Sequence, residues 1–150
     1  MVRQRVSLAG GTSRGLVLDL IRTLGPISRV ELAETTGLTQ ATMSTVVRQL
    51  LGEGLVIETG RGESTGGKPP VMLDVNPDAR FAVGVQLGRE SITYVVINLS
   101  GSIVGRTRTT GIGSTEPSEM VQRLAAEVDR TLDGLGIEKA SVVGVGVVAP

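Results

Sequence analysis

The sequence contains neither cysteine nor histidine. Within this chain, these absences exclude disulfide bonds, metal sites built on thiolates or imidazoles, and nucleophiles that a histidine activates. Aromatic side chains are also scarce, because Phe81 and Tyr94 are the only ones. Since proteins hold unpaired bases by stacking them on aromatic rings, the composition argues against a site for single-stranded nucleic acid.

Charge of one sign is not in excess either. Fifteen Lys and Arg balance fifteen Asp and Glu, so a polyanionic partner must meet a local patch rather than a wholly basic surface. No apolar run reaches the ~18 to 20 residues that cross a bilayer, and the residues after Arg3 and Arg5 lack the unbroken apolar run of a secretory signal. We therefore expect a cytoplasmic protein without a membrane partner.

Length and periodicity indicate two small domains. The 150 residues, 40% of them hydrophobic, suffice for one ordinary domain or two small ones. Apolar residues recur at helical spacing up to Leu51 and at strand spacing from about Leu55 onward. We place the boundary near Asn76 and Pro77, which predicts one domain over residues 1–76 and a second over residues 77–150.

The first domain begins with two predicted helices. Thr12 or Ser13 can cap a helix that ends at Gly25-Pro26. Ser28 and Glu31 fit a capping box that opens a second helix. That helix runs to Thr36, where Gly37 can adopt the left-handed conformation that closes it. The apolar stripe of the first helix consists of Leu16, Val17, Leu20, Ile21 and Leu24.

A third helix follows after three residues, the spacing of a helix-turn-helix. Thr39 caps it, and Gly52 and Gly54 end it. No acidic residue lies between Thr39 and Gly52, so a polyanion can approach without repulsion, and Ala41 allows a close approach. The side chains expected to face a DNA groove are Gln40, Thr42, Ser44, Thr45 and Arg48. A helical bundle with a threonine-rich surface is the alternative interpretation.

Two strands, over Leu55–Thr59 and Val71–Val75, enclose a glycine-rich loop. This pattern is typical of the wing of a winged helix, and Arg61 and Lys68 are its candidate contacts to the phosphate backbone of duplex DNA. The stretch from Gly62 to Lys68 also matches the phosphate-binding pattern G-x-x-x-x-G-K. We reject that interpretation, because proline follows where the pattern needs Ser or Thr and a helix start.

The second domain is predicted to have the order β-β-β-α-β. Strands over 81–87, 91–99 and 102–109 are joined by turns short enough for antiparallel hairpins. Thr115 or Ser118 opens a helix, and 141–148 forms a parallel strand expected to be buried on both faces. We interpret the G-x-G-x-x-A pattern of Gly144–Ala149 as structural strand glycines. The predicted apolar line of the helix is Val121, Leu124, Val128, Leu132 and Leu135.

Three stretches together resemble transcriptional regulators of the ROK family (repressors, open reading frames and sugar kinases): TQATMSTVVRQLLGEGLV, the loop ending GGKPP, and FAVGVQLGRESITYVVINLSGSIVG. The similarity runs from Ser13 to Pro150. It implies an α/β chain with an N-terminal winged helix-turn-helix followed by the beginning of an actin-like ATPase (ribonuclease H-like) domain. It further implies a nucleoid-associated repressor that binds operator DNA as a dimer or higher oligomer and responds to a sugar or sugar derivative.

The same resemblance argues against an enzyme. Sugar kinases of the family carry Asp-x-Gly-Gly-Thr after the first actin-like strand, whereas this chain has Gln86-Leu87-Gly88-Arg89-Glu90. We expect no catalytic residue and no cofactor, since the family's zinc ligands and sugar-contacting residues lie in a downstream part, beyond an apparent truncation at Pro150. A family sugar kinase with an appended winged helix, or a winged-helix protein-interaction module, is the alternative.

Overall fold

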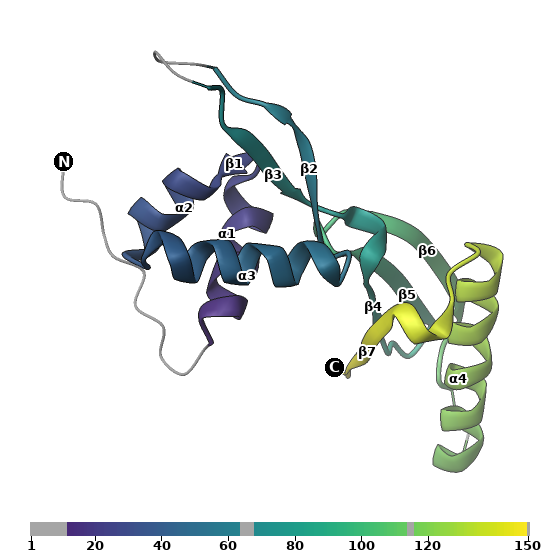
Figure 1. Cartoon of the computed structure of the whole chain (residues 1–150). Coiled ribbons are helices and arrows are strands. Elements are labelled where there is room, and N and C mark those ends of the chain that lie inside the picture. The colour runs from purple at the N-terminus through teal and green to yellow at the C-terminus, as the bar shows by residue number, and fades with distance from the viewer. Residues whose placement is uncertain (1–11, 64–67, 114–115, 150) are drawn as a thin grey trace. The chain divides into compact units, whose positions relative to one another are not determined.

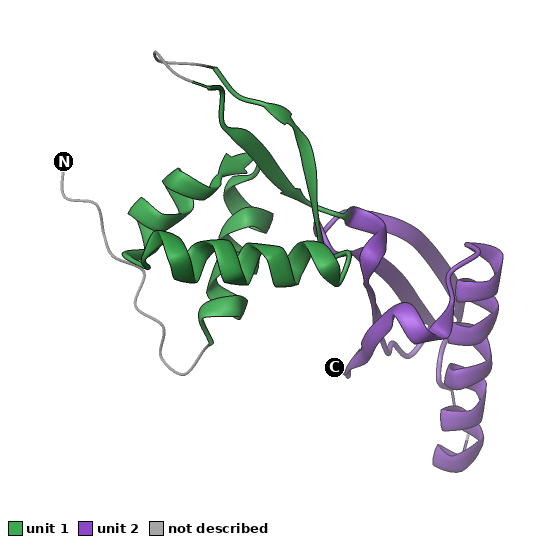
Figure 2. Ribbon diagram, in the orientation of Figure 1, with its two compact units in different colours: residues 1–76 green, residues 77–150 purple. Residues whose placement is uncertain are grey.

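The computed structural model describes residues 12–63, 68–113 and 116–149. The chain divides into two compact units, Met1–Asn76 and Pro77–Pro150 (Figure 2). Each unit has its own buried core, so each is described separately.

The first unit is a winged helix, in which three helices pack with a three-stranded antiparallel sheet of order β1-β3-β2. The β2–β3 hairpin extends beyond the helices (Figure 1). Its elements, in chain order, are α1 (Ser13–Leu24), β1 (Ile27–Ser28), α2 (Arg29–Thr36), α3 (Gln40–Gly52), β2 (Val56–Arg61) and β3 (Val71–Val75).

The helix ends follow the predicted capping signals. Thr12 caps α1 by accepting a hydrogen bond from the Gly15 amide at 3.2 Å. The capping box of α2 is complete: Ser28 Oγ accepts from the Glu31 amide at 3.3 Å, and a Glu31 carboxylate oxygen accepts from the Ser28 amide at 2.9 Å. Gly37 closes α2 with φ of 73°. These three predictions are confirmed.

The core of the first unit is built from the predicted apolar stripes, with two differences. Leu24, expected on the α1 stripe, is 51% exposed because α1 ends at this residue. The two-residue strand β1 was not expected, since it pairs with β3 across a long stretch of chain (Ile27 with Leu73) and has no local signal. The fully buried side chains are Val17, Ile21, Leu32, Met43, Val47, Leu50, Val56 and Leu73.

The wing strands differ slightly from the prediction. β3 has the expected bounds, but β2 runs from Val56 to Arg61 rather than from Leu55 to Thr59. The pairing shifts register between Glu58 and Gly60, where glycine has φ of 134°. This irregularity lets β2 continue to Arg61, which pairs with Val71.

The second unit is a four-stranded sheet of order β6-β5-β4-β7 with α4 on one face (Figure 1). β4, β5 and β6 are antiparallel neighbours, and β7 runs parallel to β4. The prediction of a mixed α/β chain is therefore confirmed. The elements are η1 (Pro77–Ala79), β4 (Phe81–Gln86), β5 (Ser91–Asn98), β6 (Ile103–Thr110), α4 (Pro117–Gly134), η2 (Lys139–Ser141) and β7 (Val142–Val148).

Two expectations about α4 are wrong. The helix begins at Pro117, which suits a first helical position because it lacks an N–H. Ser118 therefore lies inside the helix rather than at its cap, and Thr115 is outside the described residues. Val121 is 66% exposed, whereas Met120 is 8% exposed and takes its place in the core. Leu135 lies just beyond the helix and is also exposed.

The strand β7 is parallel as predicted, but it is not buried on both faces. Val143 is 70% exposed, and the rest of the strand up to Val148 is also exposed. The buried residues of α4 pack against β4 and β5 in one cluster with Tyr94, and this cluster reaches β7 at the sheet edge only at Val142. An apolar run identifies such a strand, but it does not tell which element covers it.

Gly25 generates a stability prediction. A Cβ added there would lie 2.5 Å from the Ile21 carbonyl oxygen and 2.8 Å from Asp74 Oδ1. Gly25→Ala should therefore destabilise the first unit by about 1 to 3 kcal/mol, as overpacking does. The change in the free energy of unfolding is measured by urea titration, with hydrogen exchange of the α1 amides as the readout for the first unit. The matched control is Gly52→Ala, where a Cβ meets nothing within 4 Å; an equal loss in both variants would contradict the steric explanation.

The capping box generates a pH prediction. Hydrogen bonds from the Ser28 amide, and then from its hydroxyl, lower the pKa of Glu31 from its ordinary value of 4.5. Because the folded-state pKa is the lower one, this stabilisation is present above pH 4.5 and is lost as the pH falls through the folded-state pKa. As the pH falls through this acidic range, the free energy of unfolding of the Glu31→Gln variant should decrease less than that of the parent chain. Identical pH profiles of the two chains would refute the linkage.

Candidate nucleic-acid interface

Helix α3 has one buried side and one exposed side. Met43, Val47 and Leu50 are fully buried, and Val46 is nearly so. Because consecutive helical residues are about 100° apart, the opposite side is centred on Ala41, Thr45 and Arg48, all of which are exposed. We call these three residues the outer face of α3.

The predicted groove residues are not all equally exposed to solvent. Gln40, Thr42, Thr45 and Arg48 are exposed, whereas Ser44 is half-buried at the edge of the core. Ser44 therefore offers less surface to a partner than residue type alone suggests.

Two of the predicted hydroxyls already have partners within the helix. Thr42 Oγ1 lies 2.9 Å from Thr39 Oγ1, and Thr39 Oγ1 also accepts from the Thr42 amide at 3.2 Å. The Thr45 hydroxyl donates to the Ala41 carbonyl at 3.1 Å. From residue type alone, we expected both hydroxyls to be available to a partner. Instead, the Thr39 hydroxyl and the Ala41 carbonyl compete for them.

The first two acidic groups that follow α3 in the sequence are paired with arginines from other elements. Glu53, directly after the helix, forms an ion pair with Arg14 of α1. Glu58 of β2 lies 3.2 Å from a guanidinium nitrogen of Arg29 at the start of α2. Among the described residues, Arg48 has neither an ion pair nor a hydrogen-bond partner, so the outer face of α3 keeps an uncompensated positive charge.

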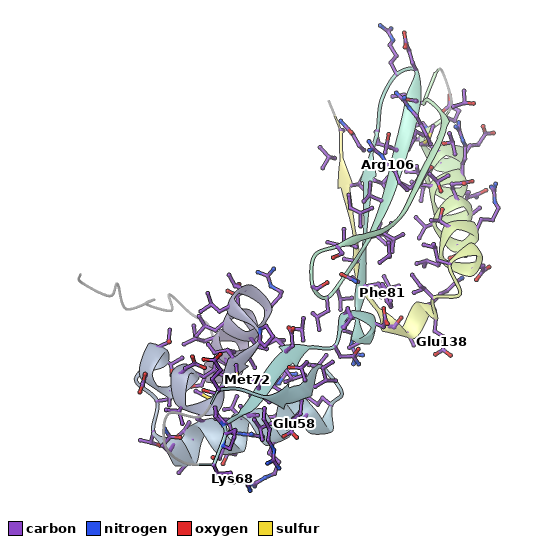
Figure 3. The ribbon with its side chains drawn as sticks, turned by 90° about the horizontal axis from the view of Figure 1, so that it is seen from above. Glu58, Lys68, Met72, Phe81, Arg106 and Glu138 are labelled. Carbon is purple, nitrogen blue, oxygen red and sulfur yellow. The ribbon has the colours of Figure 1, made fainter. Side chains whose placement is uncertain are left out.

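The wing places two more cations on the first unit. Arg61 is exposed at the end of β2, and Lys68 is exposed where the described chain resumes before β3 (Figure 3). The Gly62 amide donates to the Pro70 carbonyl at 2.8 Å, which closes the two sides of the hairpin at this point. The wing glycines Gly66 and Gly67 lie outside the described residues. Lys68 is the first described residue after them.

The loop expected at the kinase phosphate site is a tight turn in the second unit. A Cβ at Gly88 would lie 2.5 Å from the Ser91 carbonyl oxygen. The Ile112 amide donates to the Gly88 carbonyl at 3.1 Å, and the Gly111 amide to the Glu90 carbonyl at 2.9 Å. Gln86, in the position of the kinase aspartate, is exposed at the end of β4.

The G-x-G-x-x-A pattern of Gly144–Ala149 is not followed by a helix within the described chain, and a dinucleotide site of this kind needs such a helix. Gly144 and Gly146 lie inside β7, opposite Ala82 and Gly84 of the parallel strand β4. In the described part of the chain, no group of three or more acidic side chains is placed to hold a metal ion. None of the described helices has the length and apolar character needed to cross a membrane.

Sequence comparisons find a family model and several proteins that are similar to this chain. The family model described as "MarR family" matches residues 13–59, which covers the three helices and the start of the wing. The xylose repressor of Bacillus subtilis is 43% identical over 89 residues, which is 59% of this chain and 23% of the repressor. The N-acetylglucosamine repressor of Escherichia coli O157:H7 is 33% identical over 99 residues, 66% of this chain and 24% of that protein.

Longer matches extend through the second unit. An uncharacterised protein of Sinorhizobium fredii, y4fQ, is 36% identical over 134 residues, 89% of this chain and 34% of that protein. A solved ROK-family transcriptional regulator, a homologue of the Escherichia coli MLC protein, shares the fold with a TM-score of 0.69 at 24% identity, over 91% of this chain and 35% of its own. The chain thus spans about a third or less of the length of these relatives. It shares the fold of the corresponding part of this ROK-family regulator, and its sequence is similar to those of the two repressors.

Proposed function

We propose that this chain is the operator-binding portion of a sequence-specific transcriptional repressor of sugar-related genes, which responds to a sugar or sugar derivative. The observation that carries the proposal is the outer face of α3, which is free of acidic residues and presents an arginine, Arg48, with no ion-pair partner in the part of the chain that the structure describes. Two relatives, which are named xylose repressor and N-acetylglucosamine repressor, support the sugar-related role.

In the proposed complex, α3 lies in the major groove of duplex DNA. Arg48 and Gln40 carry the side chains that can form paired hydrogen bonds with guanine and adenine, respectively. Thr42 and Ser44 are also proposed to contact base edges or phosphates. The buried side of α3 holds these groups on a rigid helix, which favours base recognition over loose electrostatic contact.

The wing has a different proposed role. Arg61 and Lys68 are exposed cations on a hairpin that reaches past the helices (Figure 1), and such groups neutralise phosphates irrespective of sequence. The first 68 residues carry only two more basic than acidic side chains, which is a small charge for strong binding by one copy. We therefore propose a homodimer or higher oligomer on two operator half-sites, located at the nucleoid.

Phosphoryl transfer is not part of the proposal. The kinase reaction needs an acidic group to organise magnesium, and Gln86 supplies an amide instead. Arg89 and Glu90 stand where the kinase loop has a glycine and a threonine hydroxyl. The xylose and N-acetylglucosamine relatives are named as repressors, which agrees with a regulator rather than an enzyme.

The proposal is tested by selecting bound duplexes from a random pool, first without and then with candidate sugars. A regulator should enrich a symmetric sequence, and the correct sugar should release it. A chain that enriches no duplex and shows no salt-sensitive binding would instead be a protein-interaction module.

Arg48→Ala should weaken binding to the selected duplex by about 1 to 3 kcal/mol and relax base preference at one position of each half-site. Binding to random duplex should change much less, because the lost contact is to a base. Titrations on both duplexes measure the difference. Equal losses on the two would contradict base recognition by Arg48.

Lys68→Ala should weaken binding to all duplexes alike and reduce the slope of log affinity against log salt by about one. Arg61→Ala should behave in the same way. The matched control is Arg130→Ala, which removes an exposed arginine paired with Glu127 on α4 in the second unit. A changed base preference in the Lys68 variant would contradict a phosphate contact.

A further inference from the structure

The threonines of α3 have a property that their residue type does not reveal. The Thr45 hydroxyl donates its one hydrogen to the Ala41 carbonyl at 3.1 Å. To donate to a base, this hydroxyl would have to rotate and abandon the carbonyl. Gln40 and Arg48 need no such exchange, since neither side chain has a hydrogen-bond partner among the described residues.

The same hydrogen bond fixes where the methyl group of Thr45 goes. Threonine side chains occupy staggered rotamers, so an Oγ1 directed back to the carbonyl four residues earlier places Cγ2 in a different staggered position on the same Cβ. Thr45 is exposed and lies at the centre of the outer face of α3. The outer face therefore presents a methyl group at this position.

Ala41 adds a second methyl group next to the first. It is exposed and lies one helical turn before Thr45, so the two side chains are neighbours on the same side of α3. Arg48 follows on the next turn. The outer face is thus a two-methyl apolar spot with a cation at one end, rather than a row of hydrogen-bonding hydroxyls.

Major-groove base edges offer one apolar group that fits such a spot, the C5-methyl of thymine. We infer, resting on the proposed DNA-binding function, that Thr45 determines specificity by packing its methyl group, together with that of Ala41, against the C5-methyl of a thymine in each half-site. The hydroxyl of Thr45 serves the helix and does not read the base.

Two substitutions at Thr45 separate methyl from hydroxyl. Thr45→Ser keeps the hydroxyl and removes the methyl, whereas Thr45→Val keeps a methyl and removes the hydroxyl. Each thymine of the duplex selected by the parent chain is replaced singly by uracil, which differs only in lacking the C5-methyl. Affinity ratios for thymine over uracil are then measured for the parent chain, for both variants and for Arg130→Ala.

At one position of each half-site, uracil should weaken the parent chain about fourfold, as expected for one buried methyl contact. Thr45→Ser should lose this ratio at that position, while Thr45→Val and Arg130→Ala should retain it. The inference is overturned if no position responds to uracil, if the Ser variant retains the ratio, or if the Val variant loses it. Circular dichroism of each variant checks that α3 remains folded.

Failure of the proposed function has a different signature. If the parent chain enriches no duplex from the random pool, the proposed function fails and this inference fails with it. If a duplex is enriched but tolerates uracil at every position, the proposed function stands and only the role of Thr45 is refuted.

Discussion

The burial of one side of α3 is the constraint on which the rest of the first unit depends. Met43, Val47 and Leu50 are inaccessible to solvent, and each costs about 2 to 5 kcal/mol to truncate in a well-packed core. Because helical geometry fixes the angle between residues, anchoring these side chains also fixes which residues face outward. The outer face of α3 is thus positioned by the core, and its own polar groups need not contribute to folding.

Electrostatics then shapes what that outer face presents. Arg14 and Arg29 come from α1 and the start of α2, yet they pair with Glu53 and Glu58, the first two acidic groups after α3 in the sequence. Exposed pairs of this kind contribute only about 0 to 1 kcal/mol to stability. Their larger consequence is local charge: they offset carboxylates close to α3, while Arg48 has no described partner. Neutral overall composition therefore coexists with a surface suited to an anionic partner.

Local signals predicted most of the fold because their physics is local. A capping box, a left-handed glycine and an apolar stripe each act within a few residues, which is why the ends of α1, α2 and α3 could be placed from the sequence. The misplaced features depend on distant partners. β1 forms only by pairing with β3, and Met120 replaces Val121 in the core because helical periodicity alone leaves open which side of α4 faces the sheet.

The same distinction between local and distant causes applies to the candidate site. The sequence by itself determined that α3 carries no acidic residue and that a glycine-rich wing with Arg61 and Lys68 follows it. Only the tertiary structure decided that Ser44 is half-buried, that Glu53 and Glu58 are paired with arginines, and that the Thr45 hydroxyl is bonded to Ala41. The reason is physical: composition and spacing fix which groups exist, whereas packing and competition for hydrogen bonds fix which of them remain available to a partner.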